Sequence, residues 1–211
     1  MLAIIPARRG SKRLVNKNIK LLLGKPLISY TIEQAKVTKS ITRIVVSTED
    51  DDIARIARQS GISVISRPSS LAQDDTPMFP VIQFTLNYLG KYEGYKPIWI
   101  VLLQPTSPLR TVGDIDSAIE IIKGGQFDSL ASVFNGKENG AIYIFNRFHI
   151  LEQNTIYGTR VYQYEMPEQR SVDIDTQEDW DLAEKLMKER DDNSRKNDVA
   201  SPKRRGRPRR S

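Results

Sequence analysis

The amino-acid sequence predicts one α/β domain, with a mostly parallel sheet that carries helices on both faces. The first observation is that short apolar or β-branched runs alternate with segments of helical spacing, which is the pattern of βαβ units. The second is that Leu2–Pro6 and Pro97–Gln104 are almost continuously apolar, as strands covered on both faces are. The length of 211 residues fits one such domain and a short terminal extension.

The N-terminal part of the chain predicts two strands, a loop and two helices. Leu2–Pro6 is a short apolar strand, and the polar, basic segment Ala7–Lys20 follows it as a loop. Leu27–Lys39 is expected to be a helix, because its apolar residues recur at helical spacing. Thr42–Thr48 is rich in β-branched residues and predicts a strand. Asp50–Ser60 predicts a helix that begins with acidic residues, which are favourable at the positive end of the helix dipole.

The central part of the chain continues this alternation. Ser63–Arg67 predicts another strand, and Pro77–Leu89 predicts a helix with proline near its start, where the missing N–H costs little. Pro97–Gln104 is expected to be the central strand of the sheet. Apolar residues at helical spacing then predict a helix over 112–122.

The C-terminal part predicts two strands and a closing helix. Ser129–Phe134 and Ala141–Phe145 are the two strands. The closing helix is expected over Thr176–Arg190, with Thr176 and Asp179 as a capping box at its start.

Composition excludes several classes of protein. The chain has no cysteine, which excludes disulfides, zinc–thiolate sites and thiol catalysis. No apolar run approaches the ~20 residues that a membrane-spanning helix needs. The start of the chain, MLAIIPARRG, has no basic residue before its short apolar run. We therefore interpret it as a strand rather than a signal peptide, and expect a cytoplasmic protein.

The net charge of +6 comes from the C-terminal end of the chain. Residues 192–211 carry eight basic and two acidic groups, which leaves 24 of each sign in residues 1–191. We therefore expect one domain over 1–191 and a disordered basic tail over 192–211. The segment Lys203–Arg210, KRRGRPRR, is similar to an AT-hook, which implies weak nucleic-acid contact through the minor groove. A solvated tail, a nuclear-import signal, which would allow a nuclear location, and a non-native extension are the alternatives.

Ligands of such sheets bind beyond the carboxyl ends of the strands, so function is expected in the loops after Pro6, Arg67 and Gln104. The first of these loops has Gly10 and Ser11 at its centre, and no acidic residue. Such a loop can turn backbone N–H groups toward an anion, while its cations contact phosphate oxygens. A solvated basic loop and a nucleic-acid patch are the alternatives. The six cations, within thirteen residues, are Arg8, Arg9, Lys12, Arg13, Lys17 and Lys20.

Five blocks of sequence resemble one enzyme family. The first is IPARRGSKRLVNKNI at Ile5–Ile19. It is followed by RPSSLAQDDTP at Arg67–Pro77, QPTSPLR at Gln104–Arg110, NGAIYI at Asn139–Ile144 and DIDTQEDW at Asp173–Trp180. These blocks, in this order, are similar to those of the acylneuraminate cytidylyltransferases, including their legionaminate and pseudaminate relatives. The resemblance covers most of residues 1–190. It implies a Rossmann-like nucleotidyltransferase fold and the joining of CTP to an acidic nine-carbon sugar, with release of pyrophosphate.

The resemblance also implies roles for individual residues. Lys17, Arg8 and Asp175 are the expected catalytic residues, with the two cations neutralising charge on the phosphates. Gln104 and Tyr143 are expected to face the acceptor sugar. The expected nucleotide-binding residues are Ala7, Arg8, Ser11, Lys12, Lys17, Asn18, Arg67 and Thr76.

Asp173 and Asp175 are the expected metal ligands. Residues two apart in extended backbone point to the same face, so two such carboxylates can share one Mg²⁺ that also takes phosphate oxygens and water. The alternative is that DIDT only caps the closing helix. The family resemblance favours the metal site.

The sequence departs from the family pattern at two places. Val15 stands where the family usually has proline, which loosens the first loop without removing a phosphate ligand. Only Asn135–Glu138 separate the SVF of 132–134 from NGAIYI, where the family has a longer segment with a dimerisation arm and basic residues for the sugar carboxylate. Lys137 replaces at most one of these. We therefore expect weak or absent dimerisation. The alternatives to an enzyme are a CTP-binding remnant with little turnover and a protein tethered to DNA by its tail.

Overall fold

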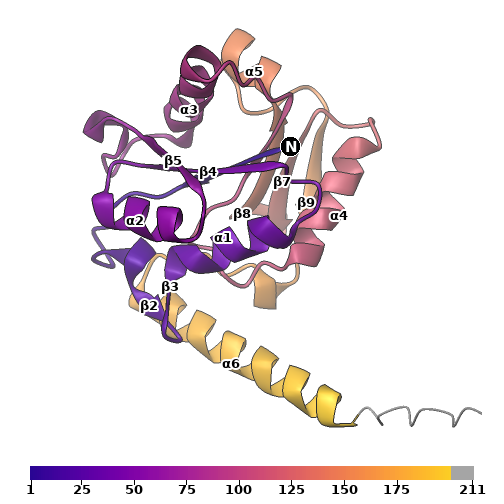
Figure 1. The fold of residues 1–211 in the computed structure, drawn as a ribbon. Helices are drawn as coiled ribbons and strands as arrows, with labels where there is room; N and C mark the ends of the chain where they lie inside the picture. Colours follow the sequence, from indigo (N-terminus) through magenta and orange to yellow (C-terminus); the bar gives the residue numbers. More distant parts are fainter. Residues whose placement is uncertain (201–211) are drawn as a thin grey trace, which may run out of the picture.

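The computed structural model describes the backbone of residues 1–200 and the side chains of residues 1–192. The chain folds around a seven-stranded sheet with the strand order β5-β4-β1-β6-β8-β7-β9 (Figure 1). Within this sheet every strand except β8 runs in the same direction, which confirms the mostly parallel sheet. The strands are β1 (Leu2–Pro6), β4 (Arg43–Thr48), β5 (Ser63–Ser66), β6 (Trp99–Leu102), β7 (Ser129–Phe134), β8 (Lys137–Asn146) and β9 (Val161–Glu165), with β2 (Leu21–Leu22) and β3 (Lys25–Pro26) as a separate pair.

Helices cover both faces of the sheet, as the sequence predicted (Figure 1). Alternate residues of β1 point to opposite faces. Ala3 and Ile5 pack with α1, α2 and α4, whereas Leu2 and Ile4 pack with α3 and α5. Because both faces are buried, β1 has no polar side, and its sequence is apolar throughout. The helices are α1 (Leu27–Val37), α2 (Asp51–Gln59), α3 (Met78–Tyr92), α4 (Val112–Lys123), α5 (Arg147–Glu152) and α6 (Gln177–Ala200).

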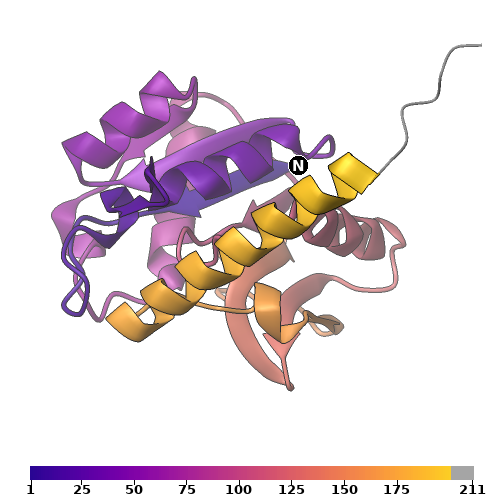
Figure 2. The ribbon, with the colours of Figure 1, turned by 90° about the horizontal axis from the view of Figure 1, so that it is seen from below.

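The closing helix α6 packs on the outside of the domain through a small apolar cluster of its own (Figure 2). Trp180, Ala183 and Met187 are its buried residues in this cluster. The helix continues to Ala200, whereas the sequence predicted its end at Arg190 and disorder from residue 192. No glycine or proline interrupts the chain between Arg190 and Ala200, so nothing in the local sequence stops the helix there. The AT-hook-like segment Lys203–Arg210 lies outside the described residues.

Other elements differ from the prediction in ways that matter for the site. β6 ends at Leu102 rather than at Gln104, so Gln104 lies in the loop that follows the strand. The sequence analysis gave no bounds for β9, α5 or the β2–β3 pair. β9 is a short edge strand with alternating half-buried residues that pairs in parallel with β7, and its sequence signal is weak for that reason. Among the described residues, no helix combines the length and the apolar character that crossing a bilayer requires.

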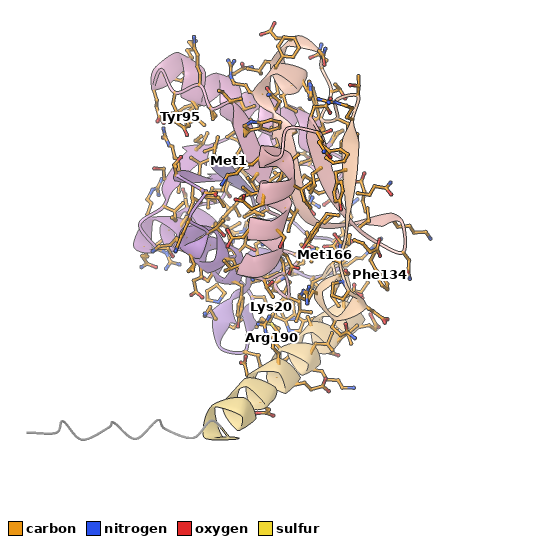
Figure 3. The ribbon with its side chains drawn as sticks, turned by 90° about the vertical axis from the view of Figure 1, so that its right-hand side faces the viewer. Met1, Lys20, Tyr95, Phe134, Met166 and Arg190 are labelled. Carbon is orange, nitrogen blue, oxygen red and sulfur yellow. The ribbon has the colours of Figure 1, made fainter. Side chains whose placement is uncertain are left out.

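β7 and β8 are joined by a tight turn. Asn135 and Gly136 form it with φ values of 51° and 72°, the left-handed conformation that asparagine and glycine tolerate best. Phe134 pairs directly with Lys137 on the other side of the turn. Figure 3 labels Phe134 at the end of β7, next to Met166, whose N–H donates to the carbonyl of Val133 at 2.8 Å. The short connection is therefore a two-residue turn at Asn135-Gly136, and it has no projecting arm.

A buried arginine connects three parts of the fold. Arg110 is fully buried, and its guanidinium donates to the Thr31 hydroxyl at 2.9 Å and to the Gln34 side chain at 3.0 Å, both on α1. It also donates to the carbonyls of Gln104, after β6, and Ala141, on β8. Burial lowers the pKa of Arg110. These bonds satisfy carbonyls that have left the regular ladder of the sheet.

We predict that Arg110→Met destabilises the protein by about 2–5 kcal/mol, because each buried carbonyl left without a donor costs about 1–3 kcal/mol. Urea unfolding followed by circular dichroism measures this loss. The exposed Arg58 on α2 provides the control Arg58→Met, which should change stability by less than about 0.5 kcal/mol. Equal stability of the two variants would contradict the role given to Arg110.

Candidate active site

A cavity of about 480 Å³ lies beyond the carboxyl ends of β1, β5 and β6. The loops after these strands line it, together with the segment that precedes α6 and the start of α3. Ala7 and Tyr143 are the predicted site residues that do not line it. The predicted residues that do are Arg8, Ser11, Lys12, Lys17, Asn18, Arg67, Thr76, Gln104, Asp173 and Asp175. Residues far apart in the sequence are thus brought to one place at the edge of the sheet that ligands of such folds use.

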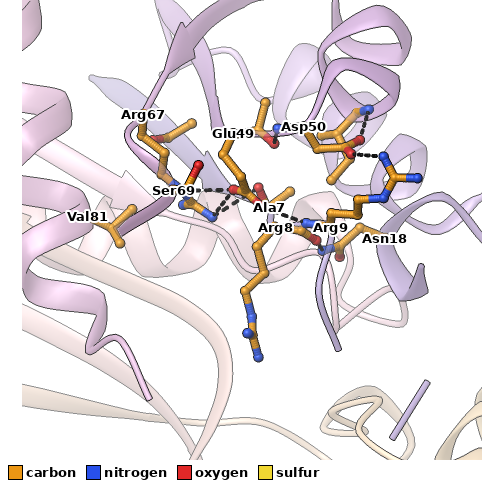
Figure 4. Close-up of polar contacts among 12 residues, drawn as sticks. Ala7, Arg8, Arg9, Asn18, Glu49, Asp50, Arg67, Ser69 and Val81 are labelled. Carbon is orange, nitrogen blue, oxygen red and sulfur yellow. Dashed lines mark hydrogen bonds and ion pairs between the residues drawn. The ribbon is translucent and has the colours of Figure 1, made fainter. Parts of the chain in front are cut away.

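The first loop divides its cations between the cavity and the surrounding protein. Arg9 is bound to the two residues that precede α2. Its guanidinium lies 3.0 Å from the Asp50 carboxylate, and its backbone N–H donates to the Glu49 carboxylate at 2.8 Å. Arg8 points the other way, away from these pairs (Figure 4). The side-chain amide of Asn18 donates to the carbonyl of Arg8 at 2.8 Å. Arg9 and Asn18 therefore fix the backbone that directs Arg8 into the cavity.

Lys17 joins the first loop to the segment before α6. It follows Asn16, whose φ of 53° turns the chain sharply into a short 3-10 helix. The Lys17 ammonium donates to the carbonyl of Ile174 at 2.6 Å and lies 2.8 Å from the Asp175 carboxylate. Val15, at the position where the family resemblance expects proline, is 76% exposed and contributes nothing to the cavity.

Arg67 is held by acceptors of the protein itself. Its guanidinium donates to the Glu49 carboxylate at 3.0 Å and to the carbonyl of Ala7 at 3.2 Å. Burial lowers the pKa of Arg67, and the carboxylate of Glu49 acts in the opposite direction. Glu49 thus binds both Arg67 and the backbone of Arg9, and so connects two of the loops that line the cavity (Figure 4). The sequence analysis missed Glu49, which looks like an ordinary polar residue before a helix.

Asp173 and Asp175 both face the cavity, on either side of a buried Ile174. Ile174 fixes this segment through its apolar contacts and through its N–H, which donates to the carbonyl of Thr106 at 2.8 Å. Burial raises the pKa of Asp173; a hydrogen bond from Thr106 opposes this rise, and the neighbouring charge of Asp175 adds to it. The i, i+2 spacing therefore places two carboxylates on one wall of the cavity.

The helix cap is made by other residues. The Asp179 carboxylate accepts hydrogen bonds from the N–H groups of Asp175 and Thr176, at 3.0 and 2.8 Å, and the Thr176 hydroxyl accepts from the N–H of Asp179. This is the predicted capping box. The carboxylates of Asp173 and Asp175 are therefore not needed for the start of α6.

The donor set fits a divalent cation that is shared with a ligand. One carboxylate oxygen of Asp173 is buried without a hydrogen-bond partner, as an oxygen reserved for a cation or water would be. The described residues contain no group of three or more histidine, cysteine or acidic side chains placed to hold a metal alone. Magnesium usually takes one or two carboxylates and completes its shell with phosphate oxygens and water, which two carboxylates facing a cavity permit.

The first residues of β8 include Glu138, a further acidic side chain, and Gly140, which lies against Gln104. Gly140, with φ of 73°, is so close to Gln104 and Asp173 that a Cβ atom there would lie 2.9 Å from the Gln104 side-chain oxygen. The Tyr143 and Tyr157 hydroxyls donate to the Glu138 carboxylate, at 3.1 and 2.6 Å. Burial raises the pKa of both tyrosines, and Glu138 raises each further. Tyr143 thus turns toward Glu138, a residue that the sequence analysis treated only as part of the short connection.

Asp74 is another residue that the sequence analysis missed. Its carboxylate lies 2.5 Å from the guanidinium of Arg8 and 3.1 Å from the ammonium of Lys12, inside the cavity. The only signal in the sequence was its place in the block RPSSLAQDDTP. Nothing in that block indicates which cations Asp74 contacts, because Arg8 and Asp74 are 66 residues apart.

Comparison with known proteins gives consistent similarities. A family model described as cytidylyltransferase matches residues 2–141. The N-acylneuraminate cytidylyltransferase of Escherichia coli is 33% identical over 218 residues, covering 87% of this chain and 51% of that protein. The CMP-N,N'-diacetyllegionaminic acid synthase of Legionella pneumophila is 36% identical over 225 residues, covering 89% of this chain and 96% of that protein. The chain thus spans about half the length of the first relative.

The aligned stretch of 225 residues is longer than the 211 residues of this chain, so the Legionella protein has residues without a counterpart here. The fold also resembles a solved structure of CMP:2-keto-3-deoxy-manno-octonic acid synthetase complexed with CTP. That likeness has a TM-score of 0.70 and 17% sequence identity, and covers 90% of this chain and 98% of the other. At this identity it is a likeness of fold.

We predict that Arg8→Ala and Lys17→Ala weaken CTP binding by about 1.5–3 kcal/mol, because each removes a charged donor from the cavity. Lys20→Ala is the control, since Lys20 does not line the cavity but donates to Gln177 at 3.0 Å and lies over the Trp180 ring. Isothermal titration calorimetry with CTP measures the three affinities. Equal losses at all three positions would indicate a diffuse basic patch instead of a site.

Proposed function

Because the chain belongs to the cytidylyltransferase family, we propose that it joins CTP to an acidic nine-carbon sugar of the sialic acid type, giving a CMP-sugar and pyrophosphate. The observation that carries this proposal is the meeting of the basic first loop and the Asp173/Asp175 pair in one cavity. Phosphoryl transfer needs positioning and neutralisation of charge more than it needs acid–base groups, and this cavity supplies both. The match to relatives that act on sialic and legionaminic acids supports the class of acceptor.

In the proposed reaction, the acceptor hydroxyl attacks the α-phosphorus of CTP and gives up its proton to solvent. The bond from that phosphorus to the bridging oxygen of the β-phosphate breaks, and pyrophosphate leaves. Arg8, Lys12 and Lys17 bind the phosphates and offset the negative charge that builds on the departing group. Gln104, with one donor and one acceptor on its side chain, orients the hydroxyls of the sugar.

Asp173 and Asp175 are proposed to hold a magnesium ion. When bound there, magnesium supplies polarisation of the α-phosphate and charge neutralisation of the leaving group. The contact between Lys17 and Asp175 connects the proposed phosphate-binding loop with the proposed metal ligands. In this arrangement the Lys17 ammonium holds the Asp175 carboxylate at the wall of the cavity, and the ammonium itself faces the phosphates. The partnerless oxygen of Asp173 supports this assignment.

The acceptor is proposed to lie beside Gln104, Gly140 and Tyr143. Tyr143 pairs across the sheet with Leu102, two residues before Gln104, so both belong to the same end of the sheet. Gly140 packs so closely against Gln104 that any side chain there would displace the Gln104 side chain. Direct assay across a panel of acidic sugars identifies the substituents that the acceptor carries.

We predict that Asp175→Asn abolishes pyrophosphate release from CTP and an acidic sugar while the fold stays intact. The substitution removes a charge that a divalent cation needs but keeps the size of the side chain. Release is measured with a coupled pyrophosphate assay across sialic and legionaminic acids, and folding by circular dichroism. Asp181→Asn, on the exposed side of α6, is the matched control and should keep full activity.

A near-wild-type rate for Asp175→Asn at limiting magnesium would show that the metal assignment is wrong. CTP binding without pyrophosphate release from the wild type, on every sugar of the panel, would favour a nucleotide-binding remnant over an enzyme.

We also propose that self-association is weak. The two-residue turn at Asn135-Gly136 cannot extend over a partner molecule. Stable dimers usually bury at least ~1,200 Å² in total, which a turn of this size does not supply. The extra residues of the Legionella relative agree with a shortened chain here.

Sedimentation velocity at micromolar concentration should therefore show mostly monomer. Compared with family members that have a longer segment at Asn135–Glu138, this protein should show a larger increase in the KM for the sugar than in the KM for CTP. The reason is that the residues on the nucleotide side of the cavity are all present. A tight dimer, in protein whose mass confirms the short turn, would contradict this prediction.

A further inference from the structure

Asp74 is an acidic residue bound inside a cluster of cations. Each of its two carboxylate oxygens is taken by a different cation: one lies 2.5 Å from Arg8 and the other 3.1 Å from Lys12. Arg8 in the first place, and Lys12 after it, hold the pKa of Asp74 below its usual range. All three side chains line the cavity that we assign to the nucleotide.

The arrangement resembles the way a phosphate group is bound. Two oxygens on one centre, each contacted by a separate cation, present to Arg8 and Lys12 what two oxygens of a phosphate would present. A triphosphate that enters the cavity must therefore take these cations from Asp74. The Asp74 carboxylate thus weakens the binding of a phosphate by occupying Arg8 and Lys12, the cations that would contact it.

Asp74 differs from the other acids that face cations of this cavity. Glu49 is mostly buried and accepts from the backbone of Arg9 as well as from Arg67, so it is part of the fold. Asp175 belongs to the proposed metal site. Among the described residues, the Asp74 carboxylate forms ion pairs only with Arg8 and Lys12, whose side chains are 31% and 81% exposed, and it lies in the loop before α3. Asp74 can therefore separate from Arg8 and Lys12 without the loss of a contact that holds the fold together.

We propose that Asp74 is an internal anion that competes with the polyphosphate for Arg8 and Lys12, and so sets how tightly nucleotide and pyrophosphate are held. The identity of the natural ligand rests on the proposed function; the competition itself does not. With Asp74 present, the cations have a partner to return to when pyrophosphate leaves. Without it, the departing pyrophosphate is the only anion that satisfies them, and it is held longer.

The neighbouring residue provides a matched control. Asp75 is exposed, carries the same charge and does not line the cavity. Asp74→Asn and Asp75→Asn therefore change the net charge equally and differ only in the contact that is lost. The test is isothermal titration calorimetry with inorganic pyrophosphate, without sugar, at low and high salt.

We expect Asp74→Asn to bind pyrophosphate about five- to tenfold more tightly than the wild type, with a smaller difference at high salt. Asp75→Asn should bind it within about twofold of the wild type. In the background Arg8→Ala/Lys12→Ala, Asp74→Asn should no longer strengthen binding, because the contested cations are gone. A further strengthening in that background would mean a general effect of charge, and would overturn the inference.

Unchanged or weaker binding in Asp74→Asn overturns the inference too, because it means that Asp74 only shapes the loop. Absence of pyrophosphate binding in both the wild type and Asp74→Asn has the same consequence. If binding strengthens as expected but no acidic sugar is turned over with CTP, the competition is upheld and the proposed function fails, so the two results are distinguishable.

Discussion

The buried guanidinium of Arg110 is the interaction on which the arrangement of this protein depends. It lies where α1, the end of β6 and the irregular start of β8 meet, and it donates to all three. A charge so deeply buried is costly unless its donors are satisfied, and the planar fork of arginine satisfies several acceptors at once. The side chain of Gln34 completes this junction by donating to the carbonyl of Pro108 at 3.0 Å. The loop that carries Gln104 is thereby held in the place where β8 brings Gly140 against it.

The positive charge of the cavity is partly neutralised by acids of the protein itself. In the described part of the chain, each basic residue that lines it has an acidic partner within 4 Å: Asp74 for Arg8 and Lys12, Asp175 for Lys17 and Arg13, and Glu49 for Arg67. Binding of a polyphosphate is therefore an exchange of partners rather than the filling of an empty positive field. Such an exchange favours release as well as capture, because the cations have acidic partners in the free protein too.

The sequence predicted the parts of this structure that local pattern determines, and missed those that depend on distant contacts. β1 was predictable because a strand buried on both faces leaves a continuous apolar run, and the start of α6 because Thr176 and Asp179 form a recognisable cap. The residues around the cavity were predicted through a family resemblance, since nothing local brings Lys17 to Asp175, 158 residues away. Arg110 and its partner Thr31 are 79 residues apart, and Asp74 and its partner Arg8 are 66 apart, so the structure was needed to find these contacts. The bounds of β9 were not predictable in the same way, because an edge strand with half-buried residues has little apolar contrast.

The turn at Asn135-Gly136 has a practical consequence for engineering. Both residues already have left-handed backbone, and the strands are paired up to Phe134 and Lys137 on either side of them. The entropic cost of closing a loop rises slowly, by about 0.6 kcal/mol for each doubling of its length. A peptide, a fluorophore-bearing linker or a small binding module inserted between Asn135 and Gly136 would therefore extend outward from the hairpin without disturbing the sheet. The tip of this hairpin is an attachment point whose residues do not line the cavity.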